Sequence, residues 1–238
     1  MRLNKILAEA GLASRRGAEK LLSDRRVTVN GIVVVEPGAV ADSAIDAIAV
    51  DGKPIVVDAA ASKLHSYIAM NKPAGVVTTA NDPQKRPTVF SFINRSERLF
   101  TVGRLDRDTE GLLLLTDDGD WAHTITHPSH EIEKEYEAIV DGVPTTESLS
   151  RFEEGVTLPD GFLAHGIASI IAVRSPRTHI SLVLREGHKR QARLMFGVLN
   201  LPVRALKRVR IGQLRLGALE TGLWRELSQT EVQAVTSV

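Results

Sequence analysis

The residues with the clearest chemical potential lie in segment 102–116, V-G-R-L-D-R-D-T-E-G-L-L-L-L-T. Charged side chains fill four of the five positions from 104 to 108, and an unbroken apolar block follows at 112–115. A buried strand can contain such a block, but a carboxylate close to the start of that strand must be solvated or paired. This pattern would hold one acid rigidly at the edge of a cleft. It makes Asp106 a candidate reactive group, with a turn or cap aspartate as the alternative.

Two further segments could supply the groups that such an acid needs. Tyr136, in the alternating strand pattern E-K-E-Y-E-A-I-V, has a flat face to offer a base. Arg193, in R-E-G-H-K-R-Q-A-R-L-M-F, follows Arg190 by three residues on a predicted helix. A half-buried strand tyrosine and a solvated or phosphate-facing arginine are the alternatives. The neighbouring Asp108 and Glu110 are better explained as solvated loop acids.

The elements that would position these residues form a unit from residue 65 to residue 238. Strands are predicted at Y-I-A-M-N-K, after the Pro-Gly turn at V-V-T-T, at 134–140, at 167–173 and at 179–184. A short helix could begin at Asp120, a second is predicted at about 189–198, and short strands with repeated glycines end the chain. Strands outnumber helices without regular alternation. This favours an α+β fold with a largely antiparallel sheet.

Residues 1–57 predict a smaller domain of two helices followed by a β-unit. Apolar residues recur at helical spacing from Leu3, and Ser14 can cap a second helix. The run R-V-T-V-N-G-I-V-V-V places two strands around Asn30-Gly31, the strongest short hairpin signal. A strand at 47–50 leads into another turn and P-I-V-V. The small polar residues that follow predict a linker at 58–64.

The net charge of +1 conceals two basic regions. The first lies within residues 1–26, and the second covers residues 185–210. Their members that we expect to contact a partner are Arg15, Arg16, Lys20, Arg25, Arg26, Lys189 and Arg190. Basic faces on a nearly neutral chain suggest a polyanion bound at defined places, and two of them favour nucleic acid over solvated surfaces.

Several classes of site are excluded by the sequence. It has no Gly-rich phosphate loop for ATP or NAD, no nucleophile elbow and no cysteine. His123, His127 and His130 suggest zinc, but Pro128 would break the helix that their spacing requires. We therefore expect no metal and no cofactor. Without a run of about 18 apolar residues or a signal-peptide core, we expect a monomeric cytoplasmic protein with no membrane partner.

The first domain resembles the small RNA-binding domain shared with ribosomal protein S-four. The matching residues are L-x-K-x-L-A-x-A-G-x-x-S-R-R followed by R-V-T-V-N-G, and they cover most of residues 1–57. The resemblance implies a grip on structured RNA through phosphate contacts from the second helix and the hairpin.

The second domain resembles pseudouridine synthases of the branch that modifies ribosomal RNA, which carries the same small domain. The matching motifs are N-K-P-x-G-x-V-T-T (71–79), G-R-L-D-x-x-T-x-G-L-L-L-L-T-x-D-G (103–119), H-P-S-x-E-x-E-K-x-Y ending at Tyr136, and E-G-x-x-R-Q-x-R-x-M-F (186–196). The implied fold is that of a pseudouridine synthase. The implied reaction detaches uracil from its ribose, turns it and reattaches it through carbon, so missing cofactor motifs are expected.

The resemblance also implies a role for each candidate. Asp106 would act at the sugar, either by attacking the anomeric carbon or by removing the neighbouring sugar proton, and Arg193 would pair with it and keep it ionised. Tyr136 would stack on the extruded base and assist loss of the proton at the new bonding carbon. Arg104 would occupy the space that the flipped nucleotide leaves.

The chain departs from the family pattern at Ala192 and Leu194, which predicts altered helix packing or one fewer phosphate contact. The loop N-D-P-Q-K-R-P-T-V-F resembles the branch that acts on large-subunit (23S) RNA, near the peptidyl-transferase region. The segment D-G-D-W-A-H-T-I-T resembles one in the branch that acts on small-subunit (16S) RNA, which is the second candidate target. Two other functions remain: a non-catalytic RNA-binding assembly factor, and a nucleoside or nucleotide hydrolase, which would need a second carboxylate or a metal near Asp106.

Overall fold

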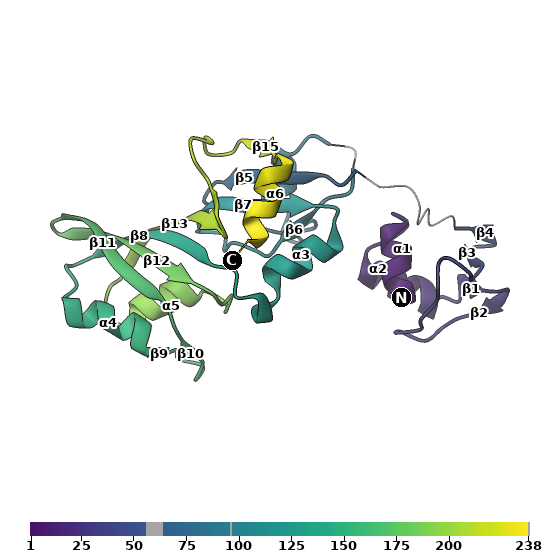
Figure 1. Ribbon diagram of the computed structural model, residues 1–238, viewed down its shortest axis with the longest axis horizontal. Coiled ribbons are helices and arrows are strands. Elements are labelled where there is room, and N and C mark those ends of the chain that lie inside the picture. Colours follow the sequence, from purple (N-terminus) through teal and green to yellow (C-terminus); the bar gives the residue numbers. More distant parts are fainter. Residues whose placement is uncertain (56–63, 96, 238) are drawn as a thin grey trace. The chain divides into compact units, whose positions relative to one another are not determined.

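The computed structural model describes residues 1–55, 64–95 and 97–237, and these fall into two compact units, Met1–Leu64 and His65–Val238 (Figure 1). The predicted linker, residues 58–64, lies outside the described residues except for Leu64, as do the last two residues of the expected P-I-V-V strand. Each unit has a hydrophobic core of its own.

The first unit contains two helices and a small antiparallel sheet in the order β2-β1-β3-β4. The helices and strands are α1 (Leu3–Glu9), α2 (Arg15–Ser23), β1 (Val27–Val29), β2 (Ile32–Val33), β3 (Ile48–Val50) and β4 (Lys53–Pro54). Ser14 caps α2 by accepting a hydrogen bond from the Gly17 amide. Asn30 and Gly31 have φ of 53° and 79°, the left-handed backbone of the expected hairpin turn.

The second unit is built on one mixed sheet in the order β11-β12-β8-β13-β7-β5-β15, with β14 on β13 and β6 on β7 (Figure 1). Its strands are β5 (Tyr67–Lys72), β6 (Phe100–Val102), β7 (Glu110–Thr116), β8 (Lys134–Asp141), β11 (Ile167–Arg174), β12 (Arg177–Leu184), β13 (Val203–Ile211), β14 (Leu214–Arg215) and β15 (Trp224–Glu226). A separate hairpin joins β9 (Val156–Thr157) and β10 (Leu163–Ala164). Between the described strands of the sheet only β7 and β13 pair in parallel, so the expected largely antiparallel α+β fold is confirmed.

Helices cover the sheet in two groups. They are α3 (Gly119–Thr126), α4 (Thr146–Glu154), α5 (Gln191–Val198) and α6 (Gln229–Thr236), with short 3₁₀ turns at Val89–Phe92 and Pro128–His130. In Figure 1, α4 and α5 lie beside β8, β11 and β12, whereas α3 and α6 lie beside β5 and β7. Within the described residues, no helix is long and apolar enough for a membrane span.

The leucine block of β7 is buried on both faces of the sheet. Leu112 and Leu114 pack into the cluster under α3 and α6, while Leu113 and Leu115 face a cluster that contains Leu105. All four leucines of β7 are 0% exposed. The candidate loop is therefore continuous with the most buried strand of the unit.

Two expectations for local structure are wrong. The segment after the Pro-Gly turn forms only an isolated bridge, Val77 to Thr88, in which the amide of Val77 donates to the Pro87 carbonyl and its carbonyl accepts from the Val89 amide. The chain ends in α6 and not in strands alone. A capping box between Ser228 and Glu231 starts this helix, and S-x-x-E was its signal in the sequence.

Candidate active site

Asp106 lies in the loop of residues 103–109, between β6 and β7, and the core holds this loop on its inner side. Its neighbour Leu105 is 5% exposed and packs in the same cluster as two leucines of β7. The Thr78 hydroxyl donates to the Leu105 carbonyl over 2.8 Å and lies 3.3 Å from its amide, from which it accepts. Asp106, 34% exposed at its side chain, thus projects from a firmly held backbone.

A buried lysine also holds this loop in place through hydrogen bonds to its backbone. Lys72, at the end of β5, is 0% exposed, and its ammonium donates to the carbonyls of Pro73 (2.9 Å), Thr109 (2.8 Å) and, more weakly, Arg107 (3.4 Å). Burial lowers the pKa of Lys72 to about 8, although the acidic side chains of the loop raise it. The Gly75 amide adds a hydrogen bond of 2.7 Å to the Arg107 carbonyl. Together these bonds define one backbone path for the loop.

Two arginines approach the loop from the start of α5. Nη1 of Arg190 lies 3.9 Å from Oδ2 of Asp106 and 3.2 Å from Oδ1 of Asp108. Nε of Arg193 lies 3.3 Å from Oδ2 of Asp108, and its Nη2 donates to the Asp108 carbonyl over 2.8 Å. Burial raises the pKa of Asp108, but the hydrogen bond from Arg190 and the charges of Arg193 and Arg190 outweigh it and hold this pKa below its usual range. Asp108 therefore gathers both cations beside Asp106.

This arrangement corrects the expected ion pair. The arginine beside Asp106 is Arg190, whereas Arg193 pairs with Asp108, which is an exposed loop acid, as expected, but is also paired with both arginines. The physical reason is the backbone of Arg190. Arg190 is the N-cap residue of α5 and has a left-handed φ of 56°. Its side chain therefore does not take the direction, relative to Arg193, that a helical spacing of three residues predicts.

Asp106 faces a cleft of about 330 Å³ that Tyr136 also lines. Tyr136 lies on β8 between β12 and β13, where its half-buried ring packs against two apolar clusters. The charged side chains that line the cleft are Arg104, Asp106, Lys134, Glu186, Lys189, Arg190 and Arg208. Five of these seven are cationic, so the cleft attracts anionic ligands.

The cleft gathers five of the six site residues predicted in the second unit. Arg104, Asp106, Tyr136, Lys189 and Arg190 line it, whereas Arg193 does not and reaches it only through Asp108. Arg104 is exposed, and its side chain has no hydrogen bond or ion pair with another described residue. It is therefore available to a ligand at the rim.

The basic residues predicted in the first unit divide into two kinds. Arg26 is held by Asp51, with Nε 2.8 Å from a carboxylate oxygen, and Lys20 is paired with Asp24 at 3.1 Å. The others are Arg15, Arg16 and Arg25, which are exposed and make no side-chain hydrogen bond or ion pair among residues 1–55 and the rest of the described chain. These three are the cations best placed to bind phosphate.

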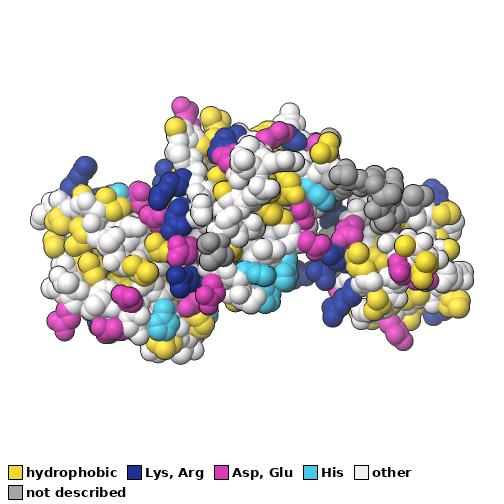
Figure 2. Space-filling view, in the orientation of Figure 1, with side chains coloured by type: hydrophobic (Ala, Val, Ile, Leu, Met, Phe, Trp, Pro, Cys, Tyr) yellow, Lys and Arg dark blue, Asp and Glu magenta, His cyan; other side chains and the backbone are white. Residues whose placement is uncertain are grey.

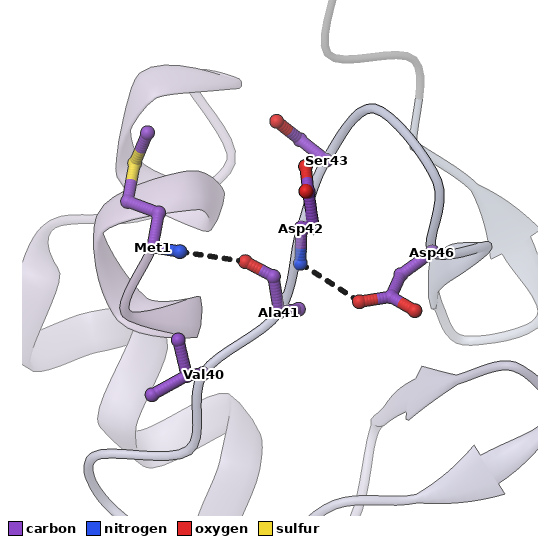
Figure 3. Close-up of a pocket in the computed structure, with 6 residues that line it drawn as sticks. All are labelled: Met1, Val40, Ala41, Asp42, Ser43 and Asp46. Atoms are coloured by element: carbon purple, nitrogen blue, oxygen red, sulfur yellow. Dashed lines mark hydrogen bonds between the residues drawn. The ribbon is translucent and has the colours of Figure 1, made fainter.

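A second hollow, of about 400 Å³, lies in the first unit (Figure 3). Its groups are occupied in stabilising the fold: the Met1 ammonium donates to the Ala41 carbonyl over 2.8 Å, and the Asp46 carboxylate accepts from the Asp42 amide over 2.7 Å. The amide of Asp42 and the side chain of Asn30 lower the pKa of Asp46. This hollow therefore offers structural polar contacts and not a reactive group.

The three histidines cluster after all, beside the end of α3 (Figure 2). The ring of His123 lies 4.8 Å from that of His127 and 6.4 Å from that of His130, measured between centroids. The helix ends at Thr126, before Pro128, as expected. Among the described residues, no group of His, Cys, Asp or Glu has the arrangement of a metal site.

Three basic residues of the site, Lys72, Lys134 and Arg208, are not predicted from the sequence. Lys72 could have been found from the N-K-P motif. Lys134 lies two residues before Tyr136 on an alternating strand, so Lys134 and Tyr136 lie on the same face of that strand. No local pattern distinguishes Arg208, because it lies in a run of basic residues, any of which could have been at the surface.

Known proteins are similar to this chain over both units. A family model described as RNA pseudouridylate synthase matches residues 66–197, and one described as S4 domain matches residues 1–40. An uncharacterized RNA pseudouridine synthase of Aquifex aeolicus is 40% identical over 98% of this chain and 92% of its own length. Ribosomal large subunit pseudouridine synthase B of Bacillus subtilis is 39% identical over 100% and 96%. A crystal structure of a pseudouridylate synthase matches with a TM-score of 0.69 and 31% identity over 99% of both chains.

Proposed function

Because the chain belongs to the RNA pseudouridylate synthase family, we propose that it converts uridine to pseudouridine in ribosomal RNA, with 23S RNA as the target. The observation that carries the proposal is Asp106, held on a fixed loop at the edge of a cationic cleft that Tyr136 also lines. A relative of similar length, named ribosomal large subunit pseudouridine synthase B, supports the large-subunit target. 16S RNA is the second candidate.

In this proposal Asp106 acts on the ribose, as nucleophile at the anomeric carbon or as base toward the neighbouring proton. Either role requires a carboxylate, and the guanidinium of Arg190 lies 3.9 Å from it as a cationic neighbour. Tyr136 stacks on the flipped uracil, and Arg104 at the rim fills the vacated space in the RNA. Arg193 supports the site indirectly, through Asp108.

The arrangement argues against a hydrolase. A hydrolase would need a second carboxylate or a metal to activate water beside Asp106. Glu186, the other carboxylate that lines the cleft, accepts a hydrogen bond from the Gln191 side chain. The other acid of the loop is Asp108, and its two carboxylate oxygens are engaged by Arg190 and Arg193. It is a counter-ion for these cations and not a free base.

We also propose that the first unit anchors the RNA and that the enzyme acts as a monomer in the cytoplasm. Arg15, Arg16 and Arg25 would bind phosphates of structured RNA, with Lys20 and Arg26 contributing less because their charges are already paired. Lys189 and Arg190 would hold the strand at the cleft.

The target is tested by mapping pseudouridines in 23S and 16S RNA from cells with and without this gene. We expect at least one pseudouridine of 23S RNA to disappear in the deletion strain and to return with the wild-type gene. A loss confined to 16S RNA would move the target to the small subunit. Unchanged maps of both RNAs would contradict the proposed function.

The anchoring role predicts a change in salt dependence. Replacing Arg15, Arg16 and Arg25 together by Gln removes three phosphate contacts, so the slope of log Kd against log salt concentration should fall by about two. The measurement is a binding titration at four salt concentrations with ribosomal RNA from the deletion strain. Lys53→Gln, which removes an exposed charge from β4, is the matched control. An unchanged slope in the triple variant would refute the anchoring role.

A further inference from the structure

Two of the cations that line the cleft are buried or half-buried and have no acidic partner among the described residues. Lys134 begins β8 and lines the cleft together with Arg208 of β13. Among the described residues neither side chain forms an ion pair, and the only hydrogen bond from the Lys134 ammonium is a long one, 3.5 Å, to the Arg185 carbonyl. Like charges buried close together are unfavourable unless an anion joins them.

Arg208 is the more deeply buried of the two. It is 4% exposed, and its Nε donates to the Leu112 carbonyl over 2.8 Å, which fixes the guanidinium between β7 and β13. Its Nη2 is buried without a hydrogen-bond partner among the described residues. An unpaired buried donor costs about 1–3 kcal/mol, so an oxygen acceptor brought to this guanidinium would stabilise the site.

The register of the sheet brings these groups to the stacking residue. Tyr136 pairs with Arg208 across β8 and β13, and Lys134 lies two residues from Tyr136 on the same strand. Residues two apart on a strand share a face, so Lys134 and Tyr136 both project into the cleft. A ring stacked on Tyr136 would therefore have its edge within reach of the two cations.

We propose that Lys134 and Arg208 form an anion subsite of the cleft, which receives a negatively charged oxygen of the target nucleotide. This inference rests on the proposed function. The burial of Arg208 favours an oxygen of the uracil ring, because the base is the part of a flipped nucleotide that enters the pocket. A phosphate oxygen offers the same chemistry.

The subsite would act when the glycosidic bond breaks. The electron pair of the C1′–N1 bond then stays with uracil, whose O2 and O4 share the charge, and it is returned when C5 bonds to C1′. The C5 proton then leaves to solvent and N1 takes up a proton, so that the product is neutral pseudouridine. Lys134 and Arg208 break no bond in this sequence. They lower the energy of the anionic base, as fixed donors do for developing oxyanions.

The experiment compares Lys134→Met, which removes the charge at nearly constant length, with Lys134→Arg, which keeps it. Lys207→Met is the control, since Lys207 neighbours Arg208 on β13 but does not line the cleft. Each full-length variant is mixed in excess with ribosomal RNA from the deletion strain. Wild-type enzyme in the same assay tests the proposed function separately, because its failure to form pseudouridine would remove that premise before Lys134 is examined.

If the ligand is a uracil oxygen, Lys134→Met should lower the single-turnover rate constant about 30-fold or more at unchanged RNA affinity. If it is a phosphate, affinity and the salt slope should fall instead, the slope by about one. Either result supports the subsite. Lys134→Arg should recover most of the loss. Rate and affinity of Lys134→Met within twofold of the Lys207→Met control would overturn the inference.

Two further readouts separate this role from a structural one. Burial and the charge of Arg208 lower the pKa of Lys134 to about 8, so removing the ammonium should leave the melting temperature equal or higher. A loss of activity together with a loss of melting temperature would indicate a structural lysine and overturn the inference. The wild-type rate should also fall above about pH 8, and Lys134→Arg should move this fall to higher pH. The other charged groups of the cleft, Arg104, Asp106, Glu186, Lys189, Arg190 and Arg208, are the same in both proteins.

Discussion

Asp106→Asn should lower pseudouridine formation by at least about 10³-fold in single-turnover assays. The amide has nearly the same shape as the carboxylate, but it can neither attack the anomeric carbon nor remove a sugar proton. The loop should keep its path, since Thr78, Lys72 and Thr109 hold it through backbone groups. RNA affinity should therefore stay within about threefold of wild type. Both quantities are measured with ribosomal RNA from the deletion strain.

The matched control is Asp108→Asn, two residues along the same loop. It removes the charge that holds Arg190 and Arg193, so both arginines lose their common partner while Asp106 remains intact. We expect a smaller loss, about 10-fold, because the reactive carboxylate survives. If Asp106→Asn retained wild-type rates, or if the loss were equal in the two variants, Asp106 could not be the group that acts on the sugar.

Local signals account for the parts that could be predicted from the sequence. The leucine block predicted a strand buried on both faces. This strand is β7, and Asp106 lies in the loop that leads into it. Asn30-Gly31 predicted the first hairpin because the left-handed conformation that its turn requires is intrinsic to these residue types. Each of these features is determined by residues that are close to one another in the sequence and belong to one element.

The partners of the acid could not be predicted because they depend on how distant segments dock. Whether Arg190 or Arg193 lies beside Asp106 is decided by the residue at which α5 begins and by the positive φ of Arg190. Arg208 enters the cleft only because β13 lies between β8 and β7 in the sheet. It is bonded to Leu112, 96 residues earlier in the chain, and no local pattern encodes that pairing.

The parallel contact of β7 with β13 predicts the largest effect on stability, at Gly111. Gly111 has φ of 103°, and a Cβ there would lie 2.2 Å from the carbonyl oxygen of Arg208 and 2.7 Å from its nitrogen. A contact with backbone cannot be relieved by a rotamer change, so Gly111→Ala must either strain β7 or separate the two strands. We expect the free energy of unfolding to fall by about 4 kcal/mol or more. Chemical denaturation of the purified protein measures this loss.

Gly217→Ala separates the two contributions. Gly217 has a positive φ of 61°, but a Cβ there would meet no atom within 4 Å, so only the left-handed backbone is penalised, at about 1–2 kcal/mol. The difference between the two variants therefore measures the clash with Arg208 together with the extra backbone strain of the φ of 103° at Gly111, which lies outside the left-handed region open to other residues. Equal losses would show that β13 yields to the extra methyl group without cost. A larger loss at Gly111 would show that the strand pair is rigid, which is the condition for Arg208 and the loop of Asp106 to keep their positions at the cleft.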